Sequence, residues 1–260
     1  MLYKKSLGQN FLVNPHYREK IFRALSLKPD DTVLEIGPGR GALSDFIAEN
    51  CGRLVMVEKD AALACALREK FSGRENIEVI TGDFMEFEIS KIPPTPFCCA
   101  NAGKGGEKLK VVGNLPYNIA SQIFIRLIEN RNHFSDLYLM FQKEMALRFV
   151  AKPSTKDYGL LTLWAAIYTD ARILFHLPQN AFFPAPKVQS SFVHFKLKEK
   201  PLISDLEAPD FFALMRLLFQ QRRKTIQSAV KKLKGLVDPH ARAEAMTVTE
   251  LIDLSRKYLN

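Results

Sequence analysis

Short apolar runs alternate with longer amphipathic segments along most of the chain. The apolar runs are rich in Val, Ile, Leu and Phe, and such runs predict buried strands. They lie at residues 32–36, 53–57, 77–80, 109–112, 137–141 and 192–197. Between them, apolar residues recur at helical spacing over residues 16–25, 42–49, 61–71, 119–129, 142–150 and 158–168. Strands that alternate with helices predict an open α/β sheet.

The pattern changes after the last predicted strand. Residues 198–209 are polar and proline-containing, which is typical of a linker, and the segments 210–235 and 248–258 are helical in pattern. We therefore expect two domains, an α/β domain of residues 1–197 and a small all-helical domain of residues 198–260.

A further segment, residues 93–107, is rich in Pro, Gly and Cys. We interpret it as an exposed, mobile insertion without an assigned role.

Composition narrows the class of protein. The chain has 260 residues, of which 47% are hydrophobic and 25% charged, as in ordinary globular proteins. Its apolar runs are far shorter than the roughly 20 residues that span a bilayer. The first residues lack the apolar core of a signal peptide. We therefore expect a cytoplasmic protein without a membrane segment.

The four cysteines form no Cys-x-x-Cys pair and have no accompanying His cluster. This pattern indicates free thiols in a reducing compartment and no metal site.

Charge suggests a polyanionic partner. The formal net charge is +9, and the segment 210–235 concentrates basic residues among apolar ones. Such a segment is compatible with a solvated helix face, a membrane-surface helix or a nucleic-acid contact. Its basic residues are Arg216, Arg222, Arg223, Lys224, Lys231, Lys232 and Lys234.

A glycine turn follows the first predicted strand. Gly37 and Gly39 stand between that strand and the next predicted helix, an arrangement that brings backbone close to a nucleotide-like ligand. The same spacing fits a methyl-donor site, a dinucleotide site or a plain turn, so the turn alone does not separate them.

Acidic residues end the next two predicted strands. Glu58 stands where a carboxylate accepts both ribose hydroxyls of a bound nucleoside, as NAD and S-adenosylmethionine both require. Asp83 stands where it accepts an adenine amino group, with Phe84 packing on the ring. Dinucleotide enzymes do not usually need the second acid, so Asp83 favours the methyl donor.

The chain is organised around residues 114–117, Asn-Leu-Pro-Tyr, at the end of the fourth predicted strand. Pro116 restricts its own φ and biases Leu115 away from the helical region. The Asn114 amide and the Leu115 carbonyl can then each accept one N–H of an exocyclic amine, while the Tyr117 ring stacks on the base. A strand-to-helix turn with a packing tyrosine is the alternative.

Several strings resemble one family, the bacterial 16S ribosomal RNA adenine N6,N6-dimethyltransferases. The similarity covers nearly the whole chain and is specific at residues 8–12, 37–41, 114–118, 142–144, 181–190 and 222–224. It implies a Rossmann-like, S-adenosylmethionine-dependent methyltransferase domain that acts without a metal. It also implies a monomer that dimethylates two adjacent adenosines in 16S rRNA of the 30S subunit or its precursor, with a role in ribosome biogenesis.

The resemblance also assigns residues that the pattern alone does not. It implies that Asn10 and Leu12 touch the cofactor and that Phe182 forms a second stacking face opposite Tyr117. In the helical domain it implies that RNA is contacted by Arg222, Arg223 and Lys224.

Related activities remain open. The 23S adenine methyltransferases of macrolide resistance and the DNA adenine methyltransferases are rivals of the same fold. A non-catalytic RNA-binding or ribosome-assembly factor is a rival of another class, and the intact Gly37, Glu58, Asp83 and Asn114 argue against it.

Overall fold

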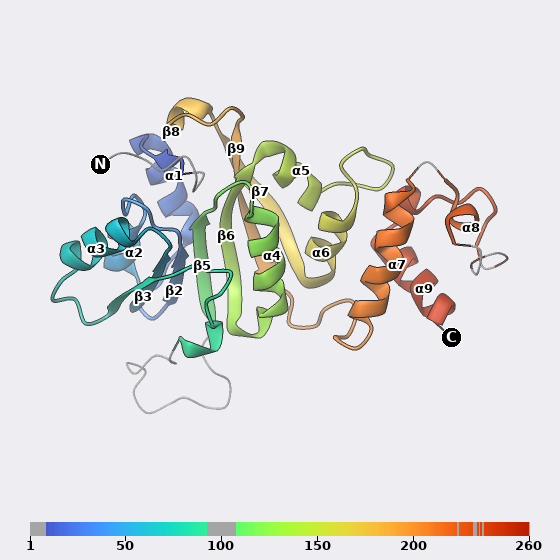
Figure 1. Ribbon diagram of the computed structural model, residues 1–260, viewed down its shortest axis with the longest axis horizontal. Helices are drawn as coiled ribbons and strands as arrows, with labels where there is room; N and C mark the ends of the chain where they lie inside the picture. Colours follow the sequence, from blue (N-terminus) through green and yellow to red (C-terminus); the bar gives the residue numbers. More distant parts are fainter. Residues whose placement is uncertain are drawn as a thin grey trace. The chain divides into compact units, whose positions relative to one another are not determined.

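The computed structural model describes residues 9–92, 108–222, 224–230, 233, 235 and 237–259. Within them, seven strands form one sheet of order β4-β3-β2-β5-β6-β9-β7 (Figure 1). Strands β2 to β6 run parallel to their neighbours, and β9 pairs antiparallel with β6. The strands are β2 (Thr32–Ile36), β3 (Arg53–Glu58), β4 (Ile77–Thr81), β5 (Leu109–Asn114), β6 (Phe134–Gln142), β7 (Thr169–Leu177) and β9 (Ser190–Leu197).

The predicted open α/β sheet is confirmed, with strand ends that differ by a few residues from the expected ones. Strand β7 was not expected, although apolar residues occupy every second position along it, at Ala171, Ile173, Phe175 and Leu177. A second sheet was also missed. It pairs β1 (Phe11–Leu12) with β8 (Phe182–Phe183), antiparallel, and two-residue strands are too short to show a period.

The helices that precede β7 in the chain are α1 (Pro15–Leu25), α2 (Ser44–Asn50), α3 (Ala61–Lys70), α4 (Ala120–Glu129), α5 (Lys143–Phe149) and α6 (Leu160–Tyr168). Two of their starts are fixed by side-chain caps. Asn14 accepts the N–H groups of His16 and Tyr17 at the start of α1, and Asp60 accepts that of Ala62 at the start of α3.

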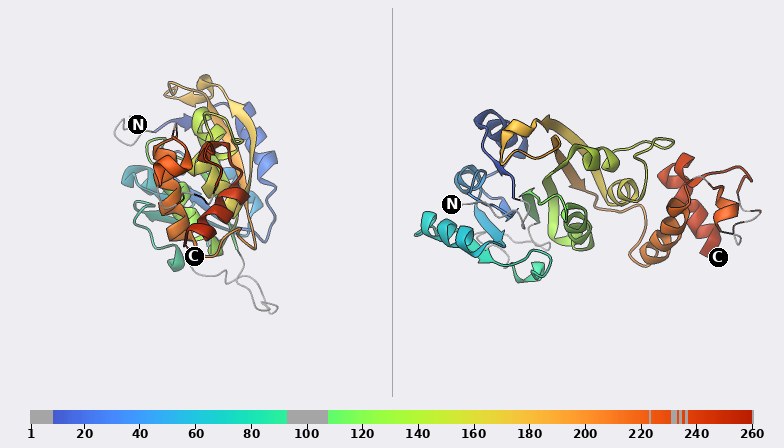
Figure 2. Two further views of the ribbon diagram at one scale, coloured as in Figure 1. Left: turned by 90° about the vertical axis from the view of Figure 1, so that its right-hand side faces the viewer. Right: turned by 45° about the horizontal axis from the view of Figure 1, so that its top comes forward.

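Helices cover both faces of the sheet. Ile21 of α1, Ile47 of α2 and Leu67 of α3 belong to one buried cluster with inward side chains of the strands. On the opposite face Phe124 of α4 packs on Phe195 of β9, with ring centroids 4.8 Å apart. Figure 2 gives two further views of the sheet and its helices. This layering leaves the carboxyl ends of the parallel strands free of helices.

The remaining helices are α7 (Ala208–Gln220), α8 (Ile226–Ala229) and α9 (Val248–Leu259). Short 3₁₀ helices are η2 (Ile89–Lys91), η3 (Arg131–His133), η4 (Gln179–Ala181) and η6 (Ala243–Ala245). The chain divides into two compact units, one of residues 1–143 and 172–197 and the other of residues 144–171 and 198–260. Helix α6 and part of α5 thus pack with the C-terminal helices, for example through Trp164, whose ring stacks on Phe212 with centroids 3.9 Å apart. The predicted insertion 93–107 lies outside the described residues.

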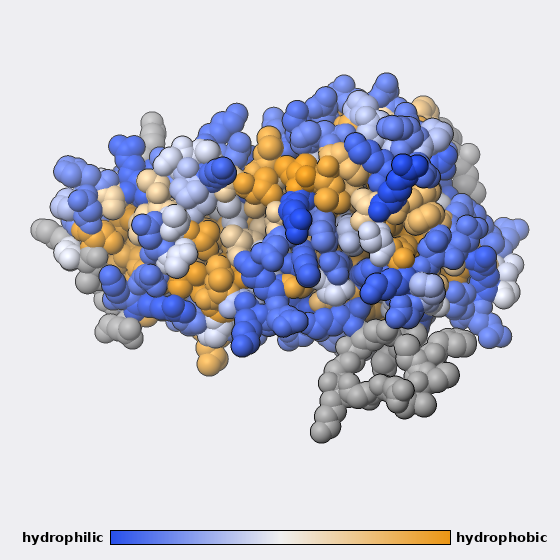
Figure 3. All heavy atoms as spheres, turned by 180° about the vertical axis from the view of Figure 1, so that it is seen from behind, coloured by the Kyte–Doolittle hydropathy of each residue, from blue (hydrophilic) through white to orange (hydrophobic). Residues whose placement is uncertain are grey.

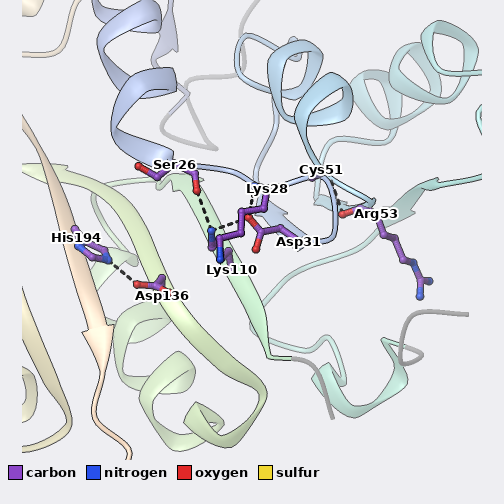
Figure 4. A network of polar contacts seen from close by, with 8 residues as sticks. All are labelled: Ser26, Lys28, Asp31, Cys51, Arg53, Lys110, Asp136 and His194. Carbon is purple, nitrogen blue, oxygen red and sulfur yellow. Dashed lines mark hydrogen bonds and ion pairs between the residues drawn. The ribbon is translucent and has the colours of Figure 1, made fainter. Parts of the chain in front are cut away.

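Polar contacts tie together the amino ends of the parallel strands (Figure 4). Lys110, at the start of β5, donates to the Asp31 carboxylate at 2.6 Å and to the Ser26 carbonyl at 3.1 Å. The paired side chains of Lys110 and Asp31 are only 13% and 15% exposed. On the neighbouring strands, His194 and Asp136 share a hydrogen bond of 2.8 Å. These contacts connect the strand ends remote from the carboxyl edge.

The surface mixes polar and apolar residues. On the face drawn in Figure 3, hydrophobic side chains reach the surface in several separate places among hydrophilic ones. Within the described residues, no helix combines the length and apolar character of a membrane span.

Candidate active site

The carboxyl ends of β2, β3, β4 and β5 border a cavity of about 350 Å³. Its wall also includes the segment around β1, so residues distant in sequence meet there. Ten residues predicted to bind cofactor or substrate line it: Asn10, Leu12, Gly37, Gly39, Glu58, Asp83, Phe84, Asn114, Leu115 and Tyr117. The structure therefore brings together nearly all the residues predicted for one site.

The glycine turn has a backbone shape that requires glycine. Gly39 has φ +59°, and a Cβ there would lie 3.0 Å from the Phe11 ring. The Arg40 guanidinium lies over the same Phe11 ring, 4.7 Å from its centroid. Segment β1 is thereby packed directly against the turn, which closes one side of the cavity.

Glu58 is buried at the end of β3 and holds the turn in place. Its carboxylate accepts the Gly39 N–H at 2.9 Å and the Asp60 N–H at 2.8 Å. Burial raises the pKa of Glu58, and the two backbone N–H groups oppose that rise. A carboxylate oriented by two N–H donors retains acceptor capacity for a ligand hydroxyl.

Asp83 is oriented by a cation that the sequence reasoning missed. Lys59 donates to one carboxylate oxygen at 2.6 Å, and the Met85 N–H donates to the other at 2.9 Å. The Lys59 hydrogen bond holds the pKa of Asp83 below its ordinary value. The acid therefore stays ionised and keeps its acceptor character. Its neighbour Phe84 is buried and lines the same wall.

Glu35 is a second missed residue of the wall. It is 3% exposed, and its carboxylate accepts the Ser44 hydroxyl at 2.7 Å. Burial raises its pKa to about 7. The signal was present in the sequence, because an acidic residue inside a short apolar strand requires a partner or a function.

The turn after β5 positions an amide and a ring. Asn114 Nδ2 donates to the Asn10 carbonyl at 2.7 Å, which fixes the amide orientation and leaves Oδ1 as an acceptor. The hydroxyl of Tyr117 shares a hydrogen bond with Ser190, so the ring is held by the start of β9. Gly113 allows the close approach of this turn to β2, since a Cβ there would lie 3.3 Å from the Ile36 carbonyl and 2.8 Å from Leu115.

The two phenylalanines of β8 differ in exposure. Phe182 is 3% exposed, belongs to the buried cluster with Leu12 and does not line the cavity. Phe183 is 57% exposed. The predicted stacking of Phe182 on a base therefore requires its ring to become accessible when the base enters.

The predicted RNA-binding residues fall after α7. Arg222 donates to the Glu244 carboxylate at 3.1 Å and to the carbonyls of Lys156 at 2.7 Å and Thr155 at 3.1 Å. Lys224 is exposed, and Arg223 lies outside the described residues. Arg222 is thus engaged within its own unit, which its sequence neighbours did not indicate.

The described part of the chain contains no group of three or more His, Cys, Asp or Glu side chains arranged to hold a metal ion. The polar groups of the cavity instead suit a nucleoside. They combine glycine backbone, an oriented acid at the end of β3, and an acid with an adjacent aromatic ring after β4.

Comparison with known proteins agrees with this geometry. Residues 2–256 match the family described as ribosomal RNA adenine dimethylase. A protein of Geobacter metallireducens named ribosomal RNA small subunit methyltransferase A is 36% identical over 97% of this chain and 94% of its own length. A protein of the same name from Prosthecochloris aestuarii is 39% identical over 95% of this chain and 90% of its own length.

Solved structures support the fold. A dimethyladenosine transferase from Plasmodium falciparum is 22% identical and superposes with a TM-score of 0.80, over 96% of this chain and 97% of its own. The 23S rRNA methyltransferase ErmE is 25% identical, with a TM-score of 0.70 over 96% of this chain and all of its own. The predicted Rossmann-like methyltransferase fold is therefore confirmed. From the family match and these identities, the chain belongs to the ribosomal RNA adenine dimethylases.

Proposed function

We propose that the protein dimethylates N6 of two adjacent adenosines in the loop near the 3′ end of 16S rRNA. The RNA is presented in the 30S subunit or its precursor, in the cytoplasm, and the protein acts as a monomer that also serves ribosome biogenesis. The observation that carries the proposal is the Asn114–Asn10 hydrogen bond of 2.7 Å. It supports an Asn114 oxygen aimed to accept from an amine at the end of β5.

The methyl donor of this family is S-adenosylmethionine, and the cavity residues fit it. Glu58 would accept the ribose hydroxyls, and Asp83 would accept the adenine amino group with Phe84 against the ring. Gly37 and Gly39 would allow close backbone approach, and Asn10 and Leu12 would contact the donor. When bound, the donor supplies an electrophilic methyl group on a sulfonium.

The residues of the chain orient the acceptor. An adenine N6 is a poor nucleophile because its lone pair is delocalised into the ring. When its two N–H groups donate hydrogen bonds to Asn114 Oδ1 and to the Leu115 carbonyl, a more pyramidal nitrogen is favoured. Rate enhancement then comes from orientation and electrostatics, without a nucleophilic side chain.

The target base must leave its stack, which costs a few kcal/mol. Stacking on Tyr117 and Phe182, worth about 1–3 kcal/mol per base, offsets that cost. The Ser190 hydroxyl, which is hydrogen-bonded to Tyr117, supports this role because it fixes the ring. Phosphates of the RNA are met in the helical unit by Arg222, Arg223 and Lys224.

The test is mass spectrometry of rRNA from cells with and without the protein, together with transfer assays on 30S particles and 23S RNA. We expect N6,N6-dimethyladenosine at two adjacent 16S positions only when the protein is present. Methylation of 23S RNA instead of 16S RNA would show that the protein has the activity of the 23S adenine methyltransferases. Absence of transfer to both, with intact RNA binding, would favour an assembly factor.

A further inference from the structure

We propose that the exposed ring of Phe183 stacks on a base of the substrate RNA next to the base that enters the cavity. Phe183, Val13 and Lys187 form what we call the rim surface. This inference rests on the proposed function, because it needs an RNA whose reacting base is extruded. It assigns to the rim surface a partner of defined chemistry, an unpaired nucleotide adjacent to the target.

Strand register separates the two phenylalanines. Phe11 pairs with Phe183 and Leu12 with Phe182. Paired residues project from the same side of a two-stranded sheet, and successive residues alternate between sides. One side therefore carries Leu12 and Phe182, both in the buried cluster. The other carries Phe11 and Phe183.

Both residues of β1 line the cavity. Of the two residues of β8, only Phe183, which shares the outer side with Phe11, is exposed. Val13 lies two residues beyond Phe11, and its N–H donates to the Ala181 carbonyl at 2.9 Å, so its side chain also belongs to the outer side. Val13 is 45% exposed and Phe183 57% exposed. The outer side of the small sheet thus presents Phe11 to the cavity and Val13 and Phe183 to solvent.

The chain after Phe183 returns to the proposed base site. It ends at Ser190, which hydrogen-bonds the Tyr117 hydroxyl. The Gln179 side chain donates to the Lys187 carbonyl at 2.6 Å, which keeps Lys187 close to the residues that precede β8. Lys187 is exposed, and no described residue forms an ion pair with its ammonium. An exposed aromatic ring and an exposed cation thus lie four residues apart on the chain segment that leads from β8 to Ser190.

Exposure alone would not single out Phe183, because apolar residues reach the surface elsewhere too (Figure 3). Its position does. An exposed ring beside a cation is the combination that binds single-stranded nucleic acid, since every base has a stacking face and every nucleotide a phosphate. A neighbour of an extruded base has lost a stacking partner, and the Phe183 ring would replace it.

The test uses the full-length protein and unmethylated small ribosomal subunits. RNA affinity, KM for the subunit at saturating donor, and donor affinity are measured for Phe183→Ala, Phe183→Leu and Phe183→Tyr. Leu174→Ala is the matched control, because Leu174 is also an exposed apolar residue of the same unit, 36% exposed, but lies on β7 and not on the β1–β8 sheet.

We expect Phe183→Ala to raise the KM and the RNA dissociation constant about 5- to 150-fold, which corresponds to about 1–3 kcal/mol for one stacked base. Phe183→Tyr should restore both, Phe183→Leu should not, and donor affinity should be unchanged in all. An unchanged KM in Phe183→Ala, or full function in Phe183→Leu, would overturn the stacking role. Failure of the proposed function would look different, because the wild-type protein would then bind RNA without transferring methyl groups.

Discussion

Two buried carboxyl groups contribute to the charge of the cavity wall. Glu35 and Glu58 lie on neighbouring strands, and each is almost fully removed from solvent. Burial raises both pKa values, and the proximity of Glu58 raises that of Glu35 further. A donor with a cationic centre is stabilised beside such groups when they are ionised. Protonation of Glu35 near neutral pH is therefore expected to influence the site.

A first prediction concerns pH and stability. Because the Glu35 pKa is raised from 4.5 to about 7 in the folded protein, the folded state holds the proton more tightly than the unfolded state. Its stabilising contribution is full below pH 4.5 and is lost as pH rises through about 7. The free energy of unfolding should thus fall by about 3 kcal/mol over this pH range. This fall should be absent in Glu35→Gln. Urea unfolding of both proteins at pH 5 and pH 8 measures it, and identical pH dependence would contradict the assignment.

At the scale of elements, short pieces of backbone decide how the cavity is closed. Segment β1 reaches the glycine turn because Gly39 has no side chain, and β8 holds β1 from the other edge. The sequence strings around these elements were recognisable, yet their pairing was not predictable. Two-residue strands carry no periodic signal, and their partner lies far away along the chain.

The close approach at Gly39 leads to a second prediction. Gly39→Ala should weaken donor binding, because the new Cβ would lie 3.0 Å from Phe11 and displace β1. The matched control is Gly73→Ala. It has a similarly positive φ of +82° but nothing within 4 Å of the added Cβ, so it should carry only the backbone strain of about 1–2 kcal/mol. Calorimetric titration with S-adenosylmethionine distinguishes them, and equal donor affinity in the two variants would refute the packing argument.

A third prediction separates two basic residues after α7. Arg222 connects three partners, Glu244, Lys156 and Thr155, whereas Lys224 is exposed. Arg222→Ala should therefore lower the free energy of unfolding by about 1–3 kcal/mol. Lys224→Ala should change it by less than about 0.5 kcal/mol.

RNA binding at different salt concentrations completes this comparison. Lys224→Ala should reduce the slope of log affinity against log salt by about 1, as expected for one lost phosphate contact. A stable Arg222→Ala protein would show that its three hydrogen bonds contribute little. An unchanged salt slope in Lys224→Ala would remove that residue from the RNA contact.

For the whole molecule, the sequence predicted the central sheet and most of the site for one reason. Parallel strands present their carboxyl ends on one edge, so Gly37, Glu58, Asp83 and Asn114 had to converge there. Contacts between side chains were not accessible in this way. The orientation of Asp83 by Lys59 depends on two loops whose relative position follows from packing, which a linear pattern does not encode.

The division of the chain into two units also depends on packing. The pattern suggested a boundary at the linker 198–209, whereas α6 packs with the C-terminal helices through Trp164. Its helical spacing was evident, but a strongly apolar helix gives no indication of which neighbour it will bury against.

The most direct test of the account measures single-turnover methyl transfer to unmethylated small subunits by Asn114→Ala, with donor affinity determined on the same protein. Asn118→Ala is the control, because Asn118 also lines the cavity but is not proposed to contact the amine. We predict that the transfer rate of Asn114→Ala falls about 10²- to 10³-fold while this variant still binds the donor. Asn118→Ala should transfer methyl groups at the wild-type rate. Transfer by Asn114→Ala at the wild-type rate would contradict the claim that this amide orients the reacting nitrogen.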